Sequence, residues 1–151
     1  MIQRIQSLLL LGAAVCFGVA CFVPIGMYGN DMEYTSWMLK NVHSDQVYCV
    51  TYVGLLQVIL TVISFAAIFF YKNRPLQSKI CTATIIIGFI LLVVMLYVYP
   101  DHVFPKIIGD AQITYHIHWA MLSILPVGLL YLANKFILKD ERKVRAADRL
   151  R

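Results

Sequence analysis

Histidine and carboxylate side chains gather at only one place where their spacing suggests chemistry. His116 and His118 form an HxH pair, and His43, Asp101, His102 and Asp110 are available on the same side in the predicted topology. Imidazole and carboxylate groups suit zinc, so this set is a candidate metal site. On a helix, however, residues i and i+2 point about 200° apart, so the two rings would share a metal only in an extended segment. Interfacial histidines that meet water and lipid headgroups are the commoner case.

The four cysteines are Cys16, Cys21, Cys49 and Cys81, and no two of them have CxxC spacing. A redox-active dithiol commonly has that spacing, so a membrane thiol oxidase is not indicated. Cys21 and Cys49 flank two apolar segments on the same side, where a disulfide is conceivable in an oxidising compartment. Its formation depends on a Cα separation that sequence does not supply. We predict no catalytic residue, no cofactor and no bound metal.

Four apolar segments must position any such site, at about 5–28, 48–71, 80–99 and 117–138. Charged residues are almost absent from them, and each is long enough to cross a hydrocarbon core of about 30 Å as a helix. The whole chain is 60% hydrophobic and 14% charged, whereas soluble domains average about 45–50% and 25%. We therefore predict an all-α membrane protein, a bundle of four transmembrane helices that forms one domain over residues 1–151.

The cations lie almost entirely on one side of these segments. Of the 13 Lys and Arg residues, 11 fall in the N-terminus, the second gap and the C-terminus, and the two outer gaps hold only Lys40 and Lys106. Cytoplasmic flanks collect Lys and Arg, so both termini are predicted to be cytoplasmic in a bacterial inner membrane. The net charge of +5 then reflects orientation and anionic lipid headgroups rather than nucleic acid.

Within the predicted spans the polar side chains are neutral. Ion-coupled carriers usually place ionisable groups at depth. Gln57 is the polar residue most clearly inside a span, and an interhelical hydrogen bond explains it better than substrate binding does. Glycines inside the spans, such as Gly54, Gly88 and Gly128, are read as close packing within the bundle, with a dimer face as the alternative.

The C-terminal segment is the most elaborate basic feature of the sequence. Residues 135–151 carry seven cations and three anions, and good helix formers predict that the fourth helix continues into the cytoplasm as a basic tail over 139–151. Val144, Ala147 and Leu150 recur at helical spacing beside the cations. This tail is our candidate contact surface for lipid or a partner, and its residues are Arg142, Lys143, Val144, Arg145, Ala147, Arg149, Leu150 and Arg151. A solvated extension that only enforces topology is the alternative.

Three strings resemble a known but uncharacterised family. MIQRIQS at the start, YKNRPLQ from Tyr71 to Gln77, and LANKFILKDERKVRAADRLR from Leu132 to Arg151 are similar to those of small four-span inner-membrane proteins of Bacteroidota, known as a domain of unknown function. The resemblance implies an integral inner-membrane protein, and it implies no activity.

Three functions remain open at this point. The favoured one is a non-enzymatic accessory or scaffold subunit whose basic tail docks a membrane or cytoplasmic protein partner. The second is a small transporter or channel component, which could act as a homo-oligomer. The third is a membrane enzyme or metal-binding protein that uses the outer histidines. Liposome flux, a stable partner or stoichiometric metal would separate them.

Overall fold

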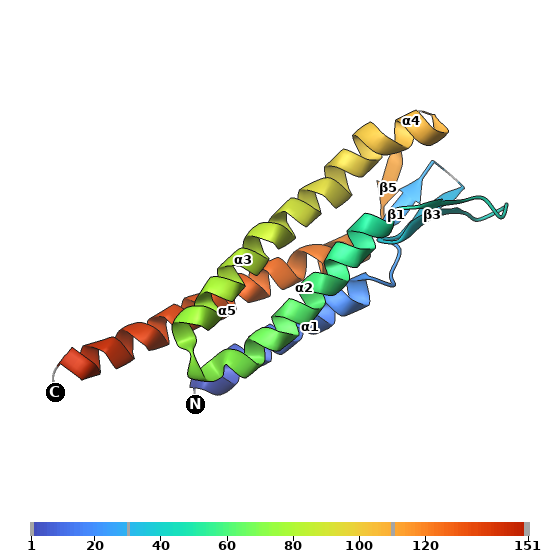
Figure 1. Ribbon diagram of the computed structural model, residues 1–151. Coiled ribbons are helices and arrows are strands. Elements are labelled where there is room, and N and C mark those ends of the chain that lie inside the picture. The colour runs from blue at the N-terminus through green and yellow to red at the C-terminus, as the bar shows by residue number, and fades with distance from the viewer. Residues whose placement is uncertain (1, 30, 110, 150–151) are drawn as a thin grey trace.

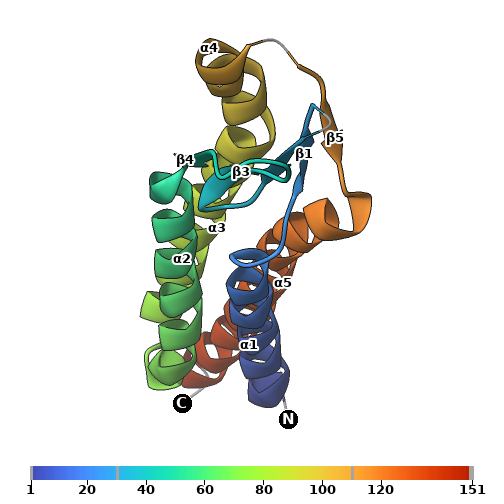
Figure 2. The ribbon, with the colours of Figure 1, turned by 90° about the vertical axis from the view of Figure 1, so that its right-hand side faces the viewer.

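The computed structural model describes residues 2–29, 31–109 and 111–149, and most of them are helical. Four long helices lie side by side: α1 (Ile2–Ala20), α2 (Thr51–Phe69), α3 (Arg74–Val93) and α5 (Ile117–Arg149). Helix α1 packs against α2 and α5, and α3 packs against the same two, which closes a ring (Figure 1, Figure 2). Fully buried apolar side chains such as Leu10, Leu60 and Leu130 fill its centre.

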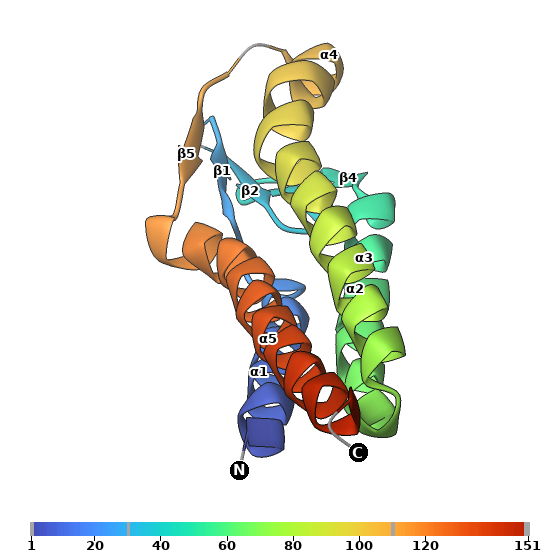
Figure 3. The same ribbon diagram turned by 90° about the vertical axis from the view of Figure 1, so that its left-hand side faces the viewer.

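A small antiparallel sheet covers one end of the helices. Its strands are β1 (Gly26–Tyr28), β2 (Met32–Tyr34), β3 (Met38–Asn41), β4 (Val47–Cys49) and β5 (Ile113–Tyr115). The first four follow one another along the chain, and β5 joins at the far side, so that the order is β4-β3-β2-β1-β5. The sheet therefore ties the segment after α1 to the segment that leads into α5 (Figure 3).

The sheet corrects the all-α prediction, which placed no strand between the helices. Gly29 has a φ of 64°, a left-handed conformation that suits the tight turn between β1 and β2. At Gly26 a Cβ atom would lie 2.6 Å from the carbonyl oxygen of Thr114, so β1 and β5 can approach only because this residue has no side chain. Strands of three or four residues leave too little alternation to be recognised from sequence.

The helix boundaries also differ from the predicted spans. Helix α1 ends at Ala20 rather than near residue 28, because the chain turns there into β1. Between the 3₁₀ turn η1 (Phe70–Lys72) and α3, which begins at Arg74, only Asn73 remains of the predicted inner turn at 72–79. Pro75 lies in the first turn of α3, where the backbone N–H that proline lacks would have no partner within the helix. The third helix does not stop at residue 99, but continues as the π-helix η2 (Val94–Val103) and α4 (Phe104–Ile108).

Three helical segments are long and apolar enough to cross a membrane, judged by length and composition. They are Thr51–Lys72, Arg74–Ile108 and Ala120–Val144, and the apolar part of α1, Ile5–Ala20, is shorter. Many large apolar side chains on the outside of the helices are exposed, among them Leu8, Val62, Phe89 and Met121. An exposed apolar surface of this extent indicates a membrane protein.

Buried polar side chains join the helices to one another. The Gln57 amide on α2 donates to the Phe17 carbonyl of α1 at 3.3 Å and accepts from the Ser36 hydroxyl at 2.7 Å. On the other side of the ring, Ser78 of α3 donates to the Asn134 amide oxygen of α5 at 2.7 Å. The interhelical hydrogen bond predicted for Gln57 is thus confirmed.

The π-helix is held to the sheet by two tyrosines. Pro100 has no N–H, so it cannot donate to the carbonyls of Met95 and Leu96, which lie five and four residues before it. Both carbonyls instead accept a hydroxyl, from Tyr34 of β2 at 3.1 Å and from Tyr115 of β5. Burial raises the pKa of Tyr34, and burial together with the Asp101 carboxylate raises that of Tyr115, so both hydroxyls keep the proton that they donate.

We expect Tyr34→Phe to lower the free energy of unfolding by about 1–3 kcal/mol, because it removes the buried hydrogen bond from the Tyr34 hydroxyl to the Met95 carbonyl. Unfolding of the detergent-solubilised protein by sodium dodecyl sulfate would measure the loss. Tyr52→Phe is the matched control, since Tyr52 is 86% exposed. Equal stability of the two variants would show that the hydroxyl bond does not hold the sheet to η2.

Candidate functional site

Helix α5 places the predicted tail as a continuation of the bundle. The helix runs from Ile117 to Arg149 with Pro126 inside it. Leu130, Ala133 and Ile137 are fully buried. Their spacing of three and four residues puts them on one side, toward α1 and α3, with which α5 packs. One turn beyond Ile137 that side becomes polar, at Asp140 and Glu141.

An ion pair fixes the inner end of α5 to the start of α3. The Nη1 atom of Arg74 lies 3.2 Å from a carboxylate oxygen of Asp140, and the two side chains are only 25% and 15% exposed. This Nη1 atom is buried and makes no hydrogen bond in the described structure, so the carboxylate is its electrostatic partner. Asp140 is therefore turned toward the bundle, and Glu141 beside it is half-buried.

The opposite side of α5 carries cations, and we call it the basic face. Its residues surround a shallow groove of about 630 Å³, and they are Lys135, Leu138, Lys139, Arg142, Lys143 and Ala146. Successive members are three or four residues apart, or adjacent, as a single helical stripe requires. The four cations are exposed, and the Leu138 side chain between them is 38% exposed. The surface is positive with an apolar middle, because Asp140 points the other way.

The structure places the sequence-predicted residues in three groups. Arg142 and Lys143 belong to the basic face, and Val144 is 44% exposed next to them. Arg145, Ala147 and Arg149 lie within α5 by their backbone. Leu150 and Arg151 lie outside the described residues.

The sequence prediction missed Lys135, Leu138, Lys139 and Ala146. Lys135 and Leu138 were left out because the predicted tail began at residue 139. Lys139 and Ala146 lie in that tail but were not among its predicted contact residues, although their helical spacing was an available signal. It also missed the pairing of Arg74 with Asp140, for which no local signal exists, since the two lie 66 positions apart in the chain.

The outer histidines do not converge. His43 lies 3.6 Å from an Asp31 carboxylate oxygen on the exposed end of the sheet, and the His102 ring packs edge-on against Tyr97 at 5.4 Å between centroids. His116 and His118 are exposed where β5 leads into α5. Among residues 2–29, 31–109 and 111–149, no three His, Cys, Asp or Glu side chains come together as a metal site would need.

The cysteines are all free in the structure. Cys21 is buried at the end of α1, whereas Cys49 is exposed on β4, so the conceivable bridge between them is not formed. Cys81 is buried within α3, as expected of a small apolar residue in a span.

Comparison with known proteins gives one family. The sequence model of the family described as Domain of unknown function (DUF4293) matches residues 2–150, which confirms the resemblance to an uncharacterised domain family. No curated protein matches, and no solved structure matches.

We expect Asp140→Asn to lower the free energy of unfolding by about 1–3 kcal/mol, because it leaves the partly buried Arg74 guanidinium uncompensated. A double-mutant cycle with Arg74→Gln would measure the coupling, and the double variant should be less destabilised than the two single losses predict together. Asp45→Asn, on an exposed hairpin, is the control. Additive effects would mean that the ion pair does not hold α5 in place.

Proposed function

This chain belongs to the family Domain of unknown function (DUF4293), and we propose that it is a four-span inner-membrane accessory or scaffold subunit that docks a partner through the basic face of α5. The proposal includes no catalytic step. The observation that carries it is the separation of charge on α5: Asp140 pairs with Arg74 on the side that faces the bundle, whereas the cations of the basic face are exposed.

The arrangement of the helices supports the proposed topology. The two ends of the chain and the η1 turn lie at one end of the helices, and the sheet lies at the other (Figure 2). Eleven of the 13 Lys and Arg residues belong to the first end in sequence. We therefore place that end in the cytoplasm and the sheet outside. The apolar part of helix α1, Ile5–Ala20, is shorter than the other three segments, about 24 Å at 1.5 Å per residue, and we take it as the fourth span.

The chemistry of the basic face supports an acidic partner. Exposed cations give long-range attraction and orientation toward a negative surface. Leu138 and Ala146 add the apolar contact that a stable interface needs at its centre. Helix α5 extends beyond the rest of the bundle in Figure 1, so the end of the basic face is open to the cytoplasm in the proposed orientation.

The polar groups of the bundle favour a scaffold over an ion-coupled carrier. The buried polar side chains that the structure describes are Gln, Ser and Thr, such as Gln57, Gln77 and Ser78, and several bond to neighbouring helices. Ion-coupled carriers rely on ionisable groups at depth, which these positions do not supply. Solute flux into liposomes that contain the purified protein would contradict the scaffold proposal.

We expect the end of the bundle that carries η1 and the tail to be cytoplasmic. In a variant without native cysteines, a cysteine at Asn73 or Lys143 should react with a membrane-impermeant thiol reagent only after the inner membrane is opened. A cysteine at Asp45 should react in intact cells with a permeable outer envelope. Labelling of Asn73 and Lys143 from outside would reverse the proposed orientation.

We expect neutralisation of the basic face to release the partner without unfolding the protein. Lys139→Gln, Arg142→Gln and Lys143→Gln together should lower capture of the crosslinked partner from native membranes at least tenfold, since each exposed ion pair contributes up to about 1 kcal/mol. Removal of residues 146–151, which deletes Ala146, Arg149 and Arg151 but leaves the four cations of the basic face, should leave insertion intact and weaken capture.

Lys40→Gln with Lys106→Gln is the control, because both cations are exposed on the opposite side of the proposed membrane. Full complementation of a deletion strain by the truncated protein would show that the tail is only a solvated extension. Loss of binding to anionic vesicles with unchanged partner capture would assign the basic face to lipid instead.

A further inference from the structure

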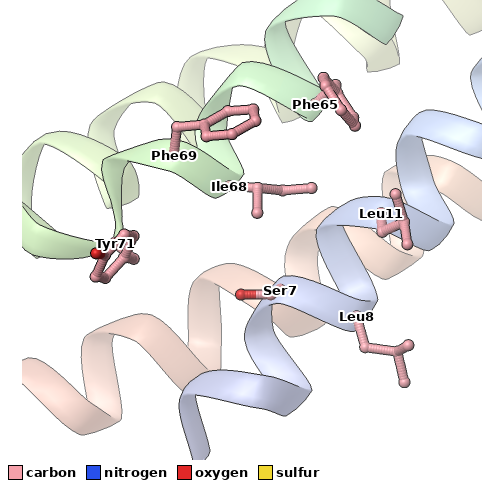
Figure 4. Close-up of a pocket in the computed structure, with 7 residues that line it drawn as sticks. All are labelled: Ser7, Leu8, Leu11, Phe65, Ile68, Phe69 and Tyr71. Atoms are coloured by element: carbon pink, nitrogen blue, oxygen red, sulfur yellow. The ribbon is translucent and has the colours of Figure 1, made fainter.

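A groove lies between α1 and α2 near the end that holds η1 (Figure 4). It has a volume of about 600 Å³. Its walls are large apolar side chains, namely Leu8, Leu11, Phe65, Ile68 and Phe69. The rings of Phe65 and Phe69 lie edge to face at 5.6 Å between centroids and form one continuous wall on α2. Leu8 is 67% exposed and Phe69 is 68% exposed, so the groove faces the surroundings rather than the core.

Polar atoms are confined to one end of this groove. Ser7 and Tyr71 complete its lining there, and among the described lining residues their hydroxyls are the only side-chain oxygens. Next to Tyr71, the exposed Lys72 ammonium lies 6.0 Å from the centre of the tyrosine ring, within the range of a cation–π contact. The groove is therefore apolar along its length, and the Lys72 ammonium lies beside the tyrosine at its polar end.

We propose that this groove binds an anionic phospholipid of the inner leaflet, with an acyl chain against Leu11 and Phe65 and the phosphate at Lys72. The proposal rests on the topology given above, which puts η1 at the cytoplasmic headgroups. From Phe65 to Tyr71 the wall spans about 9 Å, enough for the upper part of an acyl chain. Basic pockets between spans on the cytoplasmic side are typical sites for anionic headgroups.

The charge at the end of the groove argues for lipid over a second copy of the chain. A second copy inserted in the same orientation would bring its own cationic end beside Lys72. Like charges would then meet at the interface, which is unfavourable. A phospholipid with a negative headgroup matches both the apolar walls and the positive end.

Native mass spectrometry of the full-length protein in mild detergent would test the site. The probes are phosphatidylglycerol and phosphatidylcholine with the same acyl chains. We expect the protein to retain phosphatidylglycerol several-fold better. Lys72→Gln should reduce this preference about fivefold, the effect of one basic residue beside an anionic headgroup. Lys79→Gln, an exposed cation on α3, is the matched control and should change the preference less than twofold.

A second pair of variants tests the apolar walls. Leu11→Trp should fill the groove and reduce retention of both lipids, whereas Val15→Trp, one turn away on the same helix and 55% exposed, should not. Equal retention of the two lipids by the wild-type protein would overturn the proposal, as would equal effects of the two lysine variants. A dimer that Leu11→Trp dissociates would assign the groove to a second copy. Asn73 labelling reports the topology separately, so failure of the lipid site can be told from failure of the proposed function.

Discussion

The side-chain amide of Gln57 lies where α1, α2 and the loop between β2 and β3 meet. Each of these three segments has a buried polar group there. The amide nitrogen donates to the Phe17 carbonyl near the end of α1, and the amide oxygen accepts from Ser36 in the loop between β2 and β3. Ser36 also reaches the Ala20 carbonyl at 3.2 Å, where α1 ends. Buried polar groups that stay unpaired are costly, so this one cluster fixes the exit of α1, the position of α2 and the seat of the sheet together.

The same constraint explains why the sheet can sit on a helix that proline interrupts. Pro100 deprives η2 of a donor, and the hydroxyls of Tyr34 and Tyr115 supply protons to the carbonyls that precede it. Phe104 packs edge-on against the rings of Tyr28, Tyr34 and Tyr99, with centroids 4.9–5.8 Å apart. Hydrogen bonds and ring contacts together make η2, β2 and β5 one unit, and this unit carries the exposed histidines on its outside. Their separation follows from where the strands begin and end.

At the opposite end of the bundle, an ion pair joins two of the helices. Arg74 and Asp140 close the ring between α3 and α5 by an ion pair that is mostly buried. Asp140 pairs with Arg74 and faces the bundle, so the exposed basic face of α5 carries cations without this anion. Lys72 is a separate exposed cation, beside Tyr71 at the end of the groove between α1 and α2. The proposed partner contact and the proposed lipid site thus occupy different sides of the same cationic end, and both use apolar side chains beside exposed charge.

Composition and the order of charges along the chain were enough to predict a largely helical membrane protein with a continuous C-terminal helix, because apolar length and helix propensity act locally. The resemblance at the two ends and the inner turn likewise identified an uncharacterised domain family, which the match over residues 2–150 confirms. The interhelical role of Gln57 followed from its position inside a predicted span, where a neutral polar side chain is expected to find a hydrogen-bond partner on another helix. The sheet did not follow, since its strands are short and β5 pairs with β1 across 87 residues from Met27 to Thr114. Nor did the tyrosine contacts to η2 or the Arg74–Asp140 pair. Those features depend on which distant side chains share a buried space, and only the packing of the helices against one another decides that.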